Sequence, residues 1–146
     1  MIRRVFSLQR GMMSDCFFIA NQFVDAQNVI SWHDLGLNIE AEKLVLFVDE
    51  NHVGFLRGFL LGKIQSNEAV VDSLYVDKKE QRVGVGGGLL QVYEDFAKRC
   101  GVKTIKLQSR PTKQAAEFYQ KHGYKLIGTL PDIPKGNQKH LLFKEL

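Results

Sequence analysis

Apolar runs and helical patterns alternate along this chain. Apolar residues predict strands at 2–6, 44–48, 53–61 and 69–77. Turn residues at 49–52 join the second and third of these strands into a hairpin, and Asn67 marks the turn before the fourth. Three sequential antiparallel strands are therefore expected at the centre of the fold.

Two helical segments are predicted before the hairpin. Apolar residues at helical spacing predict a helix from about Met13 to Val24. The weaker pattern over 25–41 predicts a broken helix and a loop. This second segment is interpreted either as a lid that faces a substrate or as a cover over one edge of the sheet.

The second half of the chain predicts a strand, a helix and a parallel strand. Leu89, Tyr93 and Phe96 mark one face of a helix that ends at Gly101. The alternation over 102–108 predicts a half-buried strand, and because a helical crossover precedes it, we expect it to lie parallel to the 69–77 strand. A further helix from 111–112 to 121–123 and two closing strands, 124–129 and 138–146, complete the pattern.

A glycine-rich turn joins the 69–77 strand to the helix after it. Between Gly84 and Gly88 four of the five residues are glycine, so a ligand can approach the main chain closely and a positive φ costs little. Arg82 adds a cation beside the unpaired N–H groups of the first helical turn. The predicted ligand is a phosphate or pyrophosphate, and the alternative is a turn whose glycines only let two elements pack closely.

Neither of the two common nucleotide motifs is present. A Walker loop needs a glycine where Arg57 stands before Gly62-Lys63. The dinucleotide fingerprint fails because Leu89 occupies its last glycine position. What remains is the pattern Q-x-x-G-x-G over 81–86, directly after a strand.

Composition indicates one ordinary domain over residues 1–146. A chain of 146 residues with 45% apolar content buries a core without disulfides or metals. The net charge of +4 is too mild for a dedicated nucleic-acid binder, so no nucleic acid is expected as a partner. Cys16 and Cys100 form no disulfide framework, and no signal peptide or membrane-spanning run is recognised, so we expect a cytoplasmic protein that does not bind a membrane.

Two motifs resemble those of the GNAT family of N-acetyltransferases, and together they cover about residues 68–126. The first is Leu74-Tyr75-Val76 followed by Gln81-Arg82-Val83-Gly84-Val85-Gly86, which matches the family's pyrophosphate loop Q/R-x-x-G-x-G/A. The second runs from Ala115 through Phe118-Tyr119 to Tyr124 and resembles A-x-x-F-Y-x-K-x-G-F/Y. The resemblance implies an α+β fold: a mixed, mostly antiparallel sheet of six to seven strands, about four flanking helices and one splayed pair of parallel strands.

The resemblance also implies that acetyl-CoA binds in the wedge between the strands 69–77 and 102–108. The main chain of Leu74 and Val76 would pair with the pantetheine arm, and the Leu74 N–H would face the thioester carbonyl. Backbone N–H groups of the glycine turn would hold the pyrophosphate. The implied cofactor-binding residues are Leu74, Tyr75, Val76, Gln81, Arg82, Val83, Gly84, Val85, Gly86, Gly87, Thr112, Phe118, Tyr119 and Lys121.

The implied reaction is direct transfer of the acetyl group to a primary amine. A neutral amine attacks the thioester carbon, and coenzyme A leaves as a thiolate that benefits from protonation. Tyr119 stands where the family usually has its general acid. The alternative for Tyr119 is a core aromatic beside Phe118, and the motif context favours the catalytic role.

A general base or a chain of water molecules is also needed to deprotonate the amine, and two carboxylates are candidates. Glu68 and Asp72 lie on the strand that leads to the thioester site, whereas Val70 occupies a position at which the family commonly has a glutamate base. Two-residue periodicity places Asp72 on one strand face with Val70 and Leu74, from which it would face the acceptor cleft. Asp72 is slightly favoured over Glu68, and the alternative for Asp72 is a strand carboxylate that forms local hydrogen bonds. The four histidines show no metal-ligand spacing, and no metal is expected.

Polar residues around the last helix depart from the family pattern or have two interpretations. Thr112 stands where many members carry asparagine, and it is expected to cap the helix. Arg110, Lys113 and Lys121 either reach the adenosine phosphates or lie in solvent.

Other functions are weighed against acetyl transfer. One is a GNAT-fold module that senses acyl-CoA without turnover, and another is a basic RNA-binding domain, which no aromatic and basic surface motif supports. No pattern specifies the acceptor, so a small molecule, a peptide N-terminus and a lysine side chain all stay open. Residues 25–41 and 130–138 are expected to frame its pocket, and strand edges near the C-terminus allow a homodimer.

Overall fold

The computed structural model describes residues 2–8, 43–53, 56–65, 67–81 and 83–146. The predicted helix from Met13 to Val24, the predicted lid or cover over 25–41, and Arg82 lie outside the described residues.

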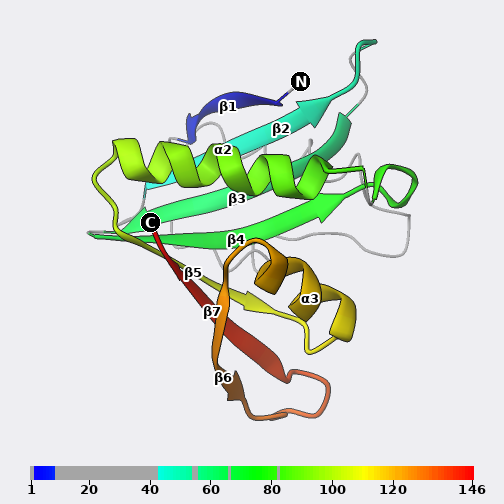
Figure 1. The fold of residues 1–146 in the computed structure, drawn as a ribbon, viewed down its shortest axis with the longest axis vertical. Coiled ribbons are helices and arrows are strands. Elements are labelled where there is room, and N and C mark those ends of the chain that lie inside the picture. The colour runs from blue at the N-terminus through cyan, green and yellow to red at the C-terminus, as the bar shows by residue number, and fades with distance from the viewer. Residues whose placement is uncertain (1, 9–42, 54–55, 66, 82) are drawn as a thin grey trace.

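Seven strands form one mixed sheet in the order β1-β2-β3-β4-β5-β7-β6 (Figure 1). Only β4 and β5 pair in parallel, and every other neighbouring pair is antiparallel. The strands are β1 (Ile2–Leu8), β2 (Lys43–Glu50), β3 (Leu56–Gln65), β4 (Glu68–Val76), β5 (Thr104–Ser109), β6 (Lys125–Leu130) and β7 (Lys139–Glu145). The predicted α+β fold, with its central antiparallel strands and one parallel pair, is confirmed.

The described residues contain two α-helices, α2 (Val85–Arg99) and α3 (Lys113–Lys121), and a short 3-10 helix, η2 (Lys78–Glu80). Both α-helices match predicted ones. The other two of the expected helices fall in the part of the chain that is not described. The predicted strand 53–61 begins later and runs further, to Gln65, because β3 pairs with β2 as far as Lys43↔Ile64.

Helix α2 lies across β1 to β4 and supplies most of the core on that face (Figure 1). The ring of Tyr93 is completely buried, and its hydroxyl lies 2.9 Å from the carbonyl oxygens of Lys63 and Val70. A Cβ at Gly62 would lie 2.3 Å from that ring, so the glycine lets the helix approach the sheet closely. The other buried members of this core include Val45, Phe47, Leu60, Ala69, Val71, Leu89, Leu90, Phe96, Ile105 and Leu142.

The opposite face of the sheet differs between its two halves. In β2 and β3 it carries the buried side chains of Leu46, Val48, Phe59 and Leu61. In β5 the corresponding positions, Lys106 and Gln108, are exposed. This open half of the sheet contains a cavity that the described residues line.

The two parallel strands separate at their carboxyl ends. Their pairing ends at Val71↔Leu107, although β4 continues to Val76 and β5 to Ser109. Figure 1 shows the two strands diverging, with α3 beside their separated ends. The splayed pair predicted from the family resemblance is therefore present.

Candidate active site

The turn between β4 and α2 is built from local hydrogen bonds. The Asp77 carboxylate accepts from the backbone N–H of Lys79 at 3.2 Å and caps η2, while the Gln81 side-chain amide donates to the Val76 carbonyl oxygen at 3.2 Å. Gly84 follows with φ +89° and is the N-cap of α2. No side chain caps this helix, so its first N–H groups are directed to the space where an anion would bind.

Glycine is needed at the positions of this turn for different physical reasons. Gly84 needs its left-handed φ, and a Cβ there would meet no atom within 4 Å. A Cβ at Gly86 would lie 3.1 Å from Cζ of Phe118, and one at Gly87 would lie 2.6 Å from Cε1 of His122. Close packing against α3 and the turn after it therefore accounts for Gly86 and Gly87, and the anion-binding interpretation rests on the backbone alone.

Helix α3 places Tyr119 against the core. The Thr112 hydroxyl accepts from the backbone N–H of Ala115 at 3.2 Å, which confirms the predicted cap. The Tyr119 ring makes edge contacts with Phe118 and Tyr124 at centroid distances of 5.0 and 5.8 Å. No hydrogen bond joins its hydroxyl to another described residue, and burial raises the pKa of Tyr119 to about 12. The phenol therefore keeps its proton at neutral pH, as a proton donor must.

Asp72 lies at a β-bulge in β4, which alters its predicted position. Leu61 pairs with Ser73 and Gly62 with Val71, so Asp72 is the extra residue of the bulge. The prediction that Asp72 shares one strand face with both Val70 and Leu74 is wrong for Leu74. Leu74 packs against the α2 core, whereas Asp72 and Val70 line the cavity on the opposite face.

Glu68, the other candidate base, lies at the start of β4. Its carboxylate pairs with the Lys106 ammonium at 2.7 Å, and both side chains are 47% exposed. Six residues of strand separate it from Leu74, which corresponds to about 20 Å at ~3.3 Å per residue. Glu68 is therefore not brought together with the splayed ends of the strands.

The open half of the sheet contains a cavity of about 600 Å³ that reaches the bulge. Its wall includes the ion pair between Lys63 and Asp72, whose nitrogen and oxygen are 3.3 Å apart. The two side chains are only 15% and 12% exposed. The described residues that line the cavity are Lys63, Val70, Val71, Asp72, Lys106, Leu107, Gln108, Ile127, Lys139, Leu141 and Leu142.

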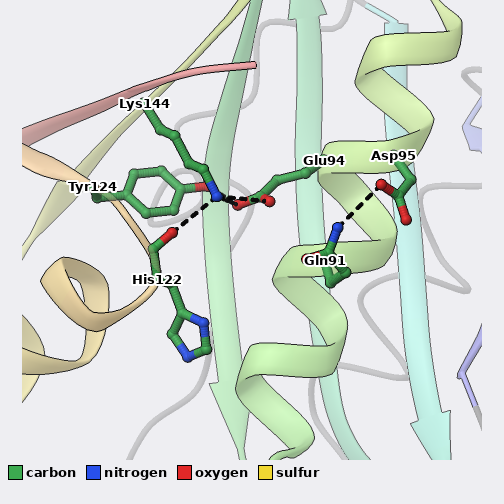
Figure 2. Close-up of polar contacts among 6 residues, drawn as sticks. All are labelled: Gln91, Glu94, Asp95, His122, Tyr124 and Lys144. Carbon is green, nitrogen blue, oxygen red and sulfur yellow. Dashed lines mark hydrogen bonds and ion pairs between the residues drawn. The ribbon is translucent and has the colours of Figure 1, made fainter.

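A buried charged cluster on the helix side of the sheet was missed by the sequence analysis. Glu94 of α2 is 4% exposed and pairs with the Lys144 ammonium at 3.0 Å (Figure 2). The same carboxylate accepts from the Tyr124 hydroxyl at 3.1 Å, and Lys144 also donates to the His122 carbonyl oxygen at 2.9 Å. The cluster thus ties α2 and β7 to the turn that carries His122. Desolvation by burial, followed by the Glu94 charge, raises the pKa of Tyr124.

The described residues contain neither a metal-binding cluster nor a membrane-spanning helix. No group of three or more His, Cys, Asp or Glu side chains that could hold a metal ion occurs among them. None of the helices in the described ranges is long and apolar enough to cross a membrane.

Comparisons with known proteins agree with this arrangement. The model of the family described as "Acetyltransferase (GNAT) family" matches residues 7–124. Blasticidin-S acetyltransferase of Streptomyces morookaense is 37% identical over 94 residues, which are 64% of this chain and 68% of that protein. The crystal structure of an acetyltransferase from Bacillus cereus ATCC 14579 is 31% identical, covers 97% of this chain and 98% of its own, and superposes with a TM-score of 0.65.

A further solved structure shows the same fold with the cofactor bound. It is a putative streptothricin acetyltransferase from Bacillus anthracis str. Ames in complex with acetyl coenzyme A. The match covers 84% of this chain and 72% of that one, with 23% identity and a TM-score of 0.64. The splayed β4–β5 pair, the uncapped helix after a glycine turn and the family match lead to one conclusion: the chain belongs to the GNAT family and is an acetyl-CoA-dependent N-acetyltransferase.

Proposed function

We propose that the acceptor is a primary amine on a small molecule, and that it enters through the cavity on the open half of the sheet. The observation that carries this proposal is the cavity itself, which reaches Asp72 at the point where β4 and β5 separate. Its volume of about 600 Å³ lies within the range of small-ligand pockets. The relative from Streptomyces morookaense, named for acetylation of the small molecule blasticidin S, supports the same class of acceptor.

The cofactor lies along the splayed strands in this proposal. The backbone N–H groups of Val83, Gly84, Gly86 and Gly87 face the pyrophosphate, and the main chain of Leu74 and Val76 runs beside the pantetheine arm. Gln81 acts indirectly, because its side-chain amide already binds the Val76 carbonyl oxygen and holds the turn in place. Phe118 packs against Gly86 and keeps α3 next to that turn.

The transfer then needs one group that accepts a proton and one that donates a proton. The amine loses a proton to Asp72 and attacks the thioester carbon, forming the C–N bond. The Leu74 N–H stabilises the oxyanion that develops. The C–S bond breaks, and the Tyr119 hydroxyl donates its proton to the leaving thiolate. The nitrogen loses its second proton to solvent, from which the Tyr119 phenolate regains a proton.

The two proton-transfer groups lie on opposite sides of β4. Tyr119 packs against the core beneath α2, on the side of Leu74, whereas Asp72 lines the cavity on the other face. An acceptor that enters from the open half therefore meets the thioester through the separated ends of β4 and β5. Asp72 is two residues, about 7 Å of strand, from Leu74, within reach directly or through one water.

The variant Asp72→Asn tests the base. We expect kcat to fall by about 10²–10⁴-fold at neutral pH while the Kd for acetyl-CoA stays unchanged. The loss should shrink as pH approaches about 10, because an alkylamine then supplies its own neutral form. The matched variant Glu68→Gln should keep most of the activity. Full activity of Asp72→Asn at neutral pH, or an equal loss in Glu68→Gln, would contradict the assignment.

Three predictions about the state of the protein stay open to test. A single domain over residues 1–146 predicts one cooperative unfolding transition. A homodimer through β6 is supported by the position of that strand at the sheet edge and by Leu126 and Ile127, which are 46% and 57% exposed. Sedimentation equilibrium tests the dimer, and cell fractionation tests the predicted cytoplasmic location.

A further inference from the structure

The cavity on the open half of the sheet is positively charged. Among the described residues that line it, Lys63, Lys106 and Lys139 are cationic and Asp72 is anionic. Asp72 is paired with Lys63 at 3.3 Å, so these two charges offset each other. Among these described lining residues the two other lysines leave an excess of positive charge, part of which Glu68 offsets through Lys106.

The two remaining lysines differ in how they are paired. The Lys106 ammonium forms an ion pair with the Glu68 carboxylate at 2.7 Å, and both side chains are about half exposed. Glu68 is not one of the described residues that line the cavity. An exposed ion pair of this kind contributes little free energy. Lys139 makes no ion pair with any residue in the described ranges and is only half-exposed at the rim of the cavity. Lys139 is therefore the group best placed to bind an external anion.

Lys139 and Asp72 lie on opposite walls of the cavity. Lys139 begins β7, which lies two strands away from β4 with β5 between them, or about 10 Å across the sheet. Between the two walls the lining is mixed: Val70, Ile127 and Leu141 are apolar, whereas Lys106 and Gln108 are polar. The cavity thus offers a proton acceptor at one end, a wall of mixed polarity in the middle and a cation at the other end.

We infer that the acceptor amine also carries an anionic group, a carboxylate or a phosphate, several bonds away from the nitrogen, and that Lys139 binds this group. The inference rests on the proposed function, because it assumes that the amine reaches Asp72 through this cavity. It gives the acceptor class as an ω-amino acid or ω-amino phosphate whose spacer is long enough to reach from Asp72 to Lys139. Polyamines, which bring a second cation toward Lys106 and Lys139, are disfavoured by the same charges.

A series of amines with the same spacer tests the inference. The probes are 6-aminohexanoate, 6-aminohexyl phosphate, 6-amino-1-hexanol and spermidine, each assayed with acetyl-CoA by release of free thiol. We expect kcat/KM for at least one anionic amine to exceed that for the alcohol by about tenfold or more, with spermidine below the alcohol. Comparing kcat/KM for 6-aminohexanoate with kcat/KM for 6-aminohexyl phosphate shows whether the site prefers a carboxylate or a phosphate.

Variants of Lys139 show whether this residue is responsible. Lys139→Gln should reduce the ratio of kcat/KM for the preferred anionic amine to that for the alcohol to about one, while Lys139→Arg should keep most of it. Lys98→Gln, an exposed lysine in the last turn of α2, is the matched control and should leave the ratio unchanged.

The outcomes separate this inference from the proposed function. If the alcohol or spermidine is acetylated as well as the anionic amines, or if Lys139→Gln keeps the preference, the anion site is excluded although a small amine is still the acceptor. If no amine in the series is acetylated while acetyl-CoA binds by calorimetry, the small-molecule acceptor is excluded and this inference falls with it.

Discussion

The imidazole of His122 occupies the space that a Cβ on Gly87 would need, with Cε1 only 2.6 Å from that position. The imidazole also lies edge-on against Phe118 at a centroid distance of 4.8 Å. The ring is therefore held from two sides, by α2 and by α3. This contact couples the first turn of α2, where the pyrophosphate is proposed to bind, to the turn after Tyr119.

The first prediction is that Gly87→Ala weakens both the fold and cofactor binding. Overpacking costs about 1–3 kcal/mol, which outweighs the ~1 kcal/mol that alanine gains over glycine in a helix. Gly88→Ala is the matched control, because its Cβ would lie 3.1 Å from the flexible end of Ile2. Urea unfolding should show a lower free energy of unfolding for Gly87→Ala than for Gly88→Ala. Calorimetry should show that Gly87→Ala also binds coenzyme A more weakly. In a His122→Ala background this difference should disappear, and its persistence would mean that the contact is not the cause.

The second prediction concerns Tyr119→Phe. Removing the hydroxyl takes away the proposed proton donor but keeps the ring that packs against Phe118 and Tyr124. We expect kcat to fall by about 10²–10⁴-fold. The free energy of unfolding should change by no more than about 0.5 kcal/mol, and the Kd for acetyl-CoA should stay the same. Steady-state kinetics measures kcat, and calorimetry measures the Kd for acetyl-CoA. An unchanged kcat would mean that water, and not Tyr119, protonates the thiolate.

The third prediction is a loss of stability at alkaline pH. Burial is the main cause that raises the pKa values of Tyr93, Tyr119 and Tyr124, in the case of Tyr119 from 10.0 to about 12. Unfolded tyrosines lose their protons near pH 10, while the folded ones keep them. The stabilisation is thus complete below about pH 10 and is lost as pH rises from there through the folded pKa values, by about 1.4 kcal/mol per pH unit for each tyrosine.

Urea midpoints measured between neutral pH and about pH 12 test this dependence. Tyr119→Phe removes one of the three groups, so the alkaline slope of the free energy of unfolding should fall by roughly one third between about pH 10 and 12. An unchanged slope in this variant would show that Tyr119 is not shielded from solvent in the folded protein.

Local patterns in the sequence predicted much of this fold and part of the site. The glycine turn before a helix, the cap at Thr112 and the parallel β5 strand each follow from short stretches of sequence with one physical explanation. The bulge at Asp72 does not, because no glycine or proline marks it and strict alternation placed Asp72 beside Leu74. A bulge depends on how β3 and β4 pair, which period-two reasoning within one strand does not contain.

Glu94 shows a different limit of the sequence pattern. It lies on the buried face of α2, four residues after Leu90 and three before Ala97, so a charge at an apolar position was a visible signal. Its partner Lys144 lies 50 residues further along the chain, on β7, and only the tertiary structure brings the two together.

The fourth prediction is that breaking the pair of Glu94 and Lys144 costs more than removing it. Lys144→Met leaves the Glu94 carboxylate, 5% exposed, with a hydrogen bond from the Tyr124 hydroxyl but without its cation, and should cost about 3 kcal/mol. The double variant Glu94→Gln with Lys144→Met leaves no buried charge and should recover most of that loss. Because Lys144 also holds the His122 carbonyl oxygen at 2.9 Å, coenzyme A affinity should fall in both variants, whatever their stability. Urea unfolding together with calorimetry separates the two effects, and equal stability of the single and double variants would show that the charge itself costs little.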